Sequence, residues 1–224
     1  LRGIRLCLHE RRDLLETQLR ALLRAGIYGN LRVMLPMVSS VQEVLDVRGM
    51  LEHLATQLDH EGQEYVSRLS LGVMIETPAA ALLAEHFAPL VDFFSIGTND
   101  LVQYTMAIDR SNERVAYLYR PTHPAILELI RRTVEAARRN NIWVSVCGQV
   151  AAEVRVVPLL VGLGVHELSM APASIPLVRR AIRSMSMHEA EKTAQEALRC
   201  SNAGDALALS EALVRRCAPE ILNI

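Results

Sequence analysis

Five short apolar segments, each followed by a segment with helical spacing, constrain the fold of this chain more than any other feature. The apolar segments are predicted strands, at residues 31–38, 69–77, 91–100, 142–149 and 165–173. Predicted helices cover 9–26, 41–60, a stretch from Pro78, a stretch after residue 100, 123–140, 151–164, 174–185 and two segments within 187–217. Strands that alternate with helices are typical of a parallel sheet covered by helices.

This repeat predicts an α/β fold but leaves two architectures open. About five βα units are visible, whereas a complete (β/α)8 barrel needs eight strands and usually about 250 residues. The chain has 224 residues. It therefore predicts either an open doubly wound sheet or a barrel whose first units lie outside the chain. We expect one domain over 1–224, with terminal helices at 187–217.

The composition is that of an ordinary globular protein. Half of the residues are hydrophobic, 22% are charged and the formal net charge is −1, which gives no reason to expect nucleic acid or an acidic membrane as a partner. The four cysteines are far apart, and no Cys/His cluster has zinc spacing. Because no signal peptide opens the chain and no apolar run reaches the roughly 20 residues that span a bilayer, we expect a cytoplasmic protein.

Polar side chains follow the predicted strands. Glu76 ends one strand, Asn99 and Asp100 end the next along the chain, and Cys147 lies near the end of a third. The carboxyl ends of parallel strands meet at one edge, so Glu76 and Asp100 should be neighbours there. Two carboxylates repel each other unless a cation or a proton intervenes, and oxygen ligands favour Mg²⁺. Alternatively, Asn99 or Asp100 caps the following helix and Glu76 is a solvated loop residue.

Two further residue types could act at this edge. Cys147 has apolar neighbours, which is typical of a buried and inert thiol, although a thiol at a ligand-binding edge can also exchange protons. Arg110 lies ten residues beyond Asp100 and could reach back over the edge, while Arg2 opens the chain. His123, before Pro124, is expected in a loop or at a helix start.

Four strings in this chain resemble one known family. "GVMIETPAA", "VDFFSIGTNDLVQYTMAIDR", "VCG" and "ELSMAPASIP" are similar to the phosphoenolpyruvate-binding domain of phosphoenolpyruvate–protein phosphotransferase, enzyme I of the bacterial sugar phosphotransferase system. The likeness runs from "LRGIR" at residues 1–5 to the terminal helices. It implies a (β/α)8 TIM barrel of the phosphoenolpyruvate/pyruvate type, of which this chain holds about the last five units plus the C-terminal helices.

The resemblance also implies roles for individual residues. Glu76 and Asp100 would hold Mg²⁺, while Arg2, Asn99, Asp100 and Arg110 would bind phosphoenolpyruvate. Cys147 would protonate the methylene carbon of the enolate as pyruvate leaves. Metal and guanidinium groups supply the charge stabilisation on which phosphoryl transfer depends.

Other features of the family have no counterpart in these residues. The first barrel strands and the phosphohistidine segment are not found, so transfer to a histidine-phosphocarrier protein would depend on an additional N-terminal domain. The resemblance further implies a homodimer. Where the family usually reads Cys-Gly-Glu before a Gly-containing turn, this chain has Gln149 and Ala151-Ala152, which affects the loop beside Cys147.

Three functions follow from these observations. The first, which we favour, is the phosphoenolpyruvate-binding part of a phosphotransferase, in a stand-alone enzyme I or in a multidomain protein. The second is a dikinase- or synthase-like phosphotransferase domain that uses ATP. The third is a non-catalytic module that dimerises or senses phosphoenolpyruvate.

Overall fold

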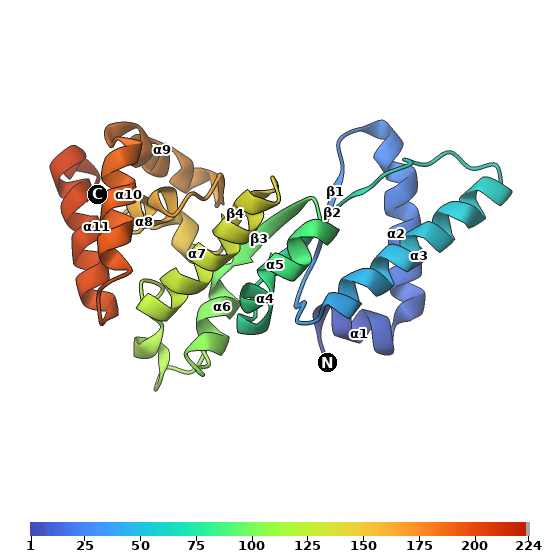
Figure 1. Ribbon diagram of the computed structural model, residues 1–224, viewed down its shortest axis with the longest axis horizontal. Helices are drawn as coiled ribbons and strands as arrows, with labels where there is room; N and C mark the ends of the chain where they lie inside the picture. The colour runs from blue at the N-terminus through green and yellow to red at the C-terminus, as the bar shows by residue number, and fades with distance from the viewer. Residues whose placement is uncertain (223–224) are drawn as a thin grey trace.

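A five-stranded parallel sheet organises the computed structural model, which describes residues 1–222 (Figure 1). The strands are β1 (Arg32–Leu35), β2 (Ser70–Ile75), β3 (Phe93–Gly97), β4 (Trp143–Cys147) and β5 (Glu167–Ser169), and they pair in chain order. The longer helices are α2 (Arg12–Ala25), α3 (Val41–His60), α6 (Thr98–Thr105), α7 (Pro124–Arg139), α9 (Ile175–Ser184), α10 (Met187–Ala197) and α11 (Ala203–Cys217). Shorter helices are α1 (Gly3–His9), α4 (Pro78–Leu82), α5 (Ala84–Phe87) and α8 (Val157–Gly162). The α/β prediction is confirmed.

The helices form three groups along the sheet. Helices α1–α3 lie at the β1–β2 end, α4–α7 lie along the middle and α8–α11 gather at the far end (Figure 1). The main core contains the row Ile75, Ile96 and Val146, which the strand register aligns on neighbouring strands. All three side chains are fully buried, so this face of the sheet is the one that the helices cover.

The opposite face of the sheet carries the polar residues. Gly97 pairs in register with Cys147, and Glu76 directly follows Ile75, the partner of Ile96. Because side chains alternate between the two faces of a strand, Glu76, Gly97 and Cys147 form the next row, on the face away from the helices. The missing side chain of Gly97 makes room for Glu76 in this row, because a Cβ at Gly97 would lie only 2.9 Å from the Cβ of Glu76, which is too close.

Several predicted segments differ from the structure in their bounds, and the strand predicted at 165–173 is reduced to β5. The strand predicted at 91–100 ends at Gly97, and α6 begins at Thr98, so Asn99 and Asp100 lie in the first helical turn. The helix predicted at 9–26 is interrupted between α1 and α2. The helix predicted at 151–164 is reduced to α8, which restarts with Pro158 in its first turn, a position that proline favours.

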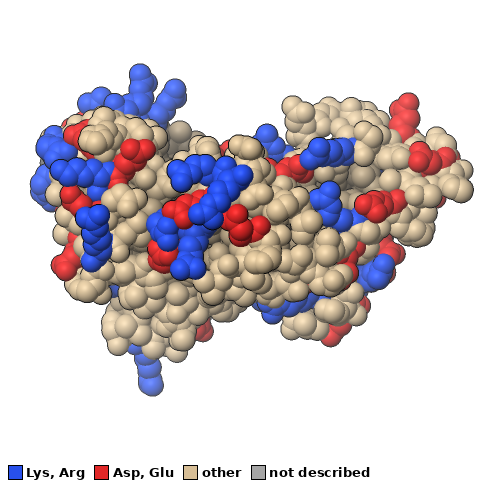
Figure 2. Space-filling view, viewed as in Figure 1, with Lys and Arg blue, Asp and Glu red and all other residues tan. Residues whose placement is uncertain are grey.

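The surface of the middle group is charged but balanced. On α7, Glu128, Arg131, Arg132 and Glu135 form ion pairs three or four residues apart. Over the part of the surface that α7 occupies, positive and negative groups are interspersed (Figure 2). Across residues 1–222, no helix combines the length and the hydrophobicity needed to cross a bilayer.

Candidate active site

Glu76 is a buried carboxylate at the carboxyl end of β2. Its side chain is 5% exposed, and its Oε1 accepts a hydrogen bond of 2.6 Å from the backbone N–H of Met37. Met37 follows β1 and has a left-handed backbone with φ 59°, a conformation that costs a non-glycine residue about 1–3 kcal/mol. The strained backbone at Met37 therefore places an N–H group that orients the carboxylate of Glu76.

Asp100 faces the same edge from the first turn of α6. Its Oδ2 lies 3.9 Å from Nη2 of Arg2, and Nη1 of Arg2 donates to the hydroxyl of Tyr104 at 3.3 Å. The start of α1 is fixed to the end of β1 because the N–H of Ile4 donates to the carbonyl of Pro36. This tether keeps Arg2 beside the carboxyl ends of the strands.

The electrostatics of Glu76 indicate that the two carboxylates are close enough to interact. Burial raises the pKa of Glu76, the Met37 amide lowers it, and the negative charge of Asp100 raises it further. Arg2 opposes these effects, but its side chain is 61% exposed and lies at the limit of ion-pair distance. The pair therefore lacks full neutralisation by Arg2, and a bound cation or proton would stabilise it.

The donor set suits Mg²⁺. This ion typically binds one or two carboxylates and keeps waters or phosphate oxygens as its remaining ligands. Between residues 1 and 222, no group of three or more His, Cys, Asp or Glu side chains converges as a complete protein cage for a metal would require. Two carboxylates at an open edge are a suitable ligand set for an ion whose remaining ligands come from a phosphorylated molecule.

Asn99 lies beside this pair, and its side-chain oxygen accepts two hydrogen bonds. The hydroxyl of Tyr119 and the backbone N–H of Gln149 each lie 3.3 Å from Oδ1. The alternative that Asn99 or Asp100 caps α6 is wrong, because α6 has Gly97 at its N-cap and no side-chain cap. The Gln149 contact uses the backbone N–H, which any residue except proline would provide.

Arg110 lies on the exposed loop that follows α6. Its backbone N–H donates to Oε1 of Gln103. Its positive charge lowers the pKa of Tyr119 against the larger effect of burial. No ion pair joins Arg110 to Asp100 in the part of the chain that is described, and its link to the site is the effect of its charge on Tyr119.

Cys147 is a half-buried thiol at the end of β4. Its Sγ lies 3.6 Å from the hydroxyl of Ser95 and 3.5 Å from the carbonyl of Ile96. Burial raises its pKa, the Ser95 hydroxyl lowers it and the charge of Glu76 raises it. The group is therefore a protonated thiol at neutral pH, which is the state that a proton donor needs.

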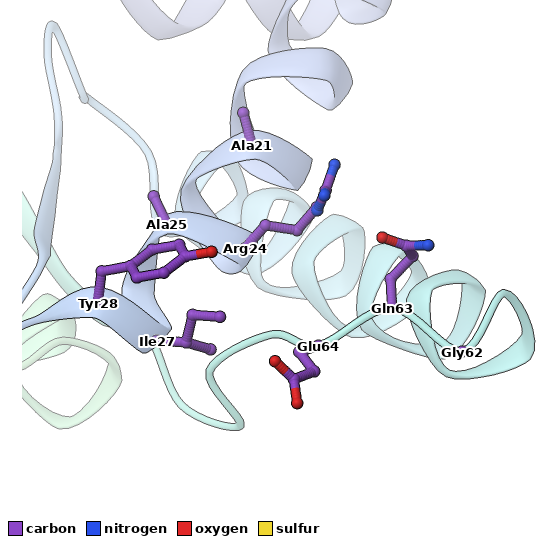
Figure 3. A pocket seen from close by; sticks show the side chains of 8 residues that line it. All are labelled: Ala21, Arg24, Ala25, Ile27, Tyr28, Gly62, Gln63 and Glu64. Atoms are coloured by element: carbon purple, nitrogen blue, oxygen red, sulfur yellow. The ribbon is translucent and has the colours of Figure 1, made fainter.

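A hollow lies at the other end of the strands and carries none of these groups. The residues that line it come from two segments (Figure 3): Ala21, Arg24, Ala25, Ile27 and Tyr28 on one side, and Gly62, Gln63 and Glu64 on the other. These segments lead into β1 and β2, whereas Glu76 follows β2. The hollow is therefore separate from the candidate site.

The structure brings together most of the residues predicted from the sequence. Glu76, Asp100 and Arg2 form one group, and Asn99 with Tyr119 forms another, on which the charge of Arg110 acts. Sequence reasoning missed Met37, Ser95 and Tyr119. His123, predicted in a loop or at a helix start, is the N-cap of α7, where its Nδ1 accepts from the N–H of Ala125.

Residues 1–187 match the family described as PEP-utilising enzyme, PEP-binding domain. The chain belongs to this family. The phosphoenolpyruvate-protein phosphotransferase of Listeria monocytogenes serovar 1/2a is 48% identical over 210 residues, and that of Staphylococcus carnosus is 46% identical over 210 residues. Each alignment covers 94% of this PEP-binding domain chain and 36% of the relative, so the chain spans about a third of the length of these relatives.

A solved structure supports the fold. A citrate lyase from Burkholderia xenovorans aligns with a TM-score of 0.55 at 16% sequence identity, over 90% of this chain and 67% of the other. At this identity the likeness concerns the fold alone. It agrees with the predicted α/β fold, in which helices follow parallel strands.

Proposed function

We propose that this chain binds phosphoenolpyruvate together with Mg²⁺ at the edge formed by Glu76 and Asp100. The observation that carries the proposal is a buried carboxylate whose pKa is raised by burial and by a second carboxylate, with an arginine at the limit of ion-pair distance. Glu76 and Asp100 would hold the ion, which when bound would offset their repulsion and withdraw charge from phosphate oxygens. Membership of a PEP-binding family supports the choice of ligand.

The polar groups around the pair suit the phosphoryl group. Arg2 lies 3.9 Å from Asp100, and the charge of Arg110 acts on Tyr119. Two guanidinium groups and the amide of Asn99 would bind phosphate oxygens as the charge on them changes during transfer. Their part in the reaction is to position the phosphoryl group and to stabilise its charge.

Cys147 would supply the proton that completes the reaction. When the phosphoryl group departs, the three-carbon fragment is an enolate, and it becomes pyruvate only when its methylene carbon gains a proton. The S–H bond of Cys147 would break, the C–H bond would form and the electron pair would remain on sulfur. The raised pKa keeps the thiol protonated, and Ser95 lies within hydrogen-bonding distance of the thiolate that results.

The complete protein would use the ligand bound at this site as the source of a phosphoryl group. We infer that the phosphoryl group passes to a histidine on another domain and then to a histidine-phosphocarrier protein of the sugar phosphotransferase system, in the cytoplasm and within a homodimer. The names of the relatives support this activity over that of an ATP-dependent dikinase or synthase. They do not favour a non-catalytic module.

Calorimetric titration of the full-length protein with phosphoenolpyruvate tests the proposal. Binding should be tight with Mg²⁺ and much weaker with EDTA. Asp100→Asn should lose the Mg²⁺-dependent part, while Asp46→Asn on the exposed face of α3 should bind as the wild type does. Equal binding by wild type and Asp100→Asn would refute the metal site, and no binding by the wild type would refute the ligand.

A further inference from the structure

Tyr119 lies at the centre of the phosphate-binding half of the site without belonging to the motifs that identify the family. It follows a short 3-10 turn, Ala116–Leu118, in the loop between α6 and α7. Its ring is half-buried and its hydroxyl lies 3.3 Å from Oδ1 of Asn99. Arg110 and Asp100 both lie close enough for their charges to act on this hydroxyl.

The orientation of the Asn99 side chain is fixed by a second contact. The backbone N–H of Gln149 is a donor only, so the Asn99 atom that it meets at 3.3 Å has to be the carbonyl oxygen. The Tyr119 hydroxyl meets the same oxygen. The amide nitrogen is consequently turned away from both partners and is available as a donor.

Gly148 makes this arrangement possible. It has φ 107°, and a Cβ on it would lie 3.0 Å from Oδ1 of Asn99. The absent side chain lets the backbone of the loop after β4 approach Asn99 closely. The loop after β4, through Gln149, and the loop after α6, through Tyr119, thus both donate to the side-chain oxygen of Asn99.

We propose that Tyr119 is a positioning residue, which fixes the Asn99 carboxamide so that its nitrogen donates to a phosphate oxygen of the ligand. The proposal rests on the proposed function, because the ligand is the phosphoenolpyruvate inferred above. Tyr119 acts through Asn99 and needs no contact of its own with the ligand. Its hydroxyl donates to Oδ1, which leaves both hydrogens of the amide nitrogen for the phosphate.

A double-mutant cycle in the full-length protein tests this role through the Kd of phosphoenolpyruvate in Mg²⁺. Tyr119→Phe removes only the hydroxyl and should weaken binding by about 3- to 10-fold, the usual range for one hydrogen bond. In the Asn99→Ala background the same change should weaken binding by no more than about 2-fold. Tyr117→Phe is the matched control, because Tyr117 is in the same loop and is 66% exposed.

A second readout needs no ligand. The side-chain amide resonances of Asn99, assigned by their loss in Asn99→Ala, should shift in Tyr119→Phe and remain in place in Tyr117→Phe. Unchanged resonances, unchanged affinity in Tyr119→Phe, or equal losses in both backgrounds would each overturn the positioning role. If the wild type itself failed to bind phosphoenolpyruvate, the proposed function would fall first and the role of Tyr119 with it.

Discussion

Replacing Gly148 with alanine should destabilise the protein and disturb the site together. The backbone at Gly148 has φ 107° and ψ −178°, a region that is almost exclusive to glycine and costs other residues about 1–3 kcal/mol. An added Cβ would also lie 2.7 Å from Oγ1 of Thr98 and 3.0 Å from Oδ1 of Asn99. Overpacking of this kind typically costs about 1–3 kcal/mol. We therefore expect a loss of about 2–6 kcal/mol in the free energy of unfolding.

Urea denaturation followed by circular dichroism measures this loss. Gly49→Ala is the matched control, because Gly49 lies inside α3 and a Cβ there has nothing within 4 Å. That substitution should stabilise the protein by about 0.5–1 kcal/mol, since alanine is the better helix former. A Gly148→Ala variant as stable as the wild type would refute the reasoning, and so would destabilisation of similar size in Gly49→Ala.

Two further predictions concern ionisable groups of the site. Because the folded-state pKa of Glu76 is raised above its ordinary 4.5, the folded state binds more protons, and its stability falls as pH rises through the window between the two values. Without divalent cations, Glu76→Gln should therefore gain in unfolding free energy relative to the wild type as the pH rises above about 4.5. A difference that stays constant with pH would contradict the burial argument. In the full-length protein, Cys147→Ala should bind phosphoenolpyruvate normally but release pyruvate about 10²- to 10⁴-fold more slowly in a coupled pyruvate assay. The control, Cys200→Ala, should keep the wild-type rate. Normal turnover by Cys147→Ala would remove the thiol from the mechanism.

The sequence predicts the repeating part of the fold well, because that part follows from local patterns. The predicted helix 41–60 agrees with α3, where Ser40 and Glu43 form a capping box. The apolar runs that predict β2 and β3 agree with their burial, which is complete along β3. The end of β3 is less predictable, because the backbone turns into α6 directly after Gly97 with no polar N-cap.

The site is predictable where chemistry lies at strand ends and unpredictable where loops contribute. Glu76 and Asp100 could be paired from the geometry of a parallel sheet alone. Tyr119 could not be found in this way, because its place depends on the path of the loop between α6 and α7. Met37 contributes through its backbone, and a side-chain pattern carries no signal for that.

The central claim is that Glu76 and Asp100 share one divalent ion. A crystal of the full-length protein grown with Mn²⁺ in place of Mg²⁺ and with phosphoenolpyruvate tests this through the anomalous signal of manganese. The account predicts a single strong peak in direct contact with carboxylate oxygens of both residues and with the ligand. A peak bound to neither carboxylate, or a well-ordered ligand at this edge without any metal peak, would contradict it.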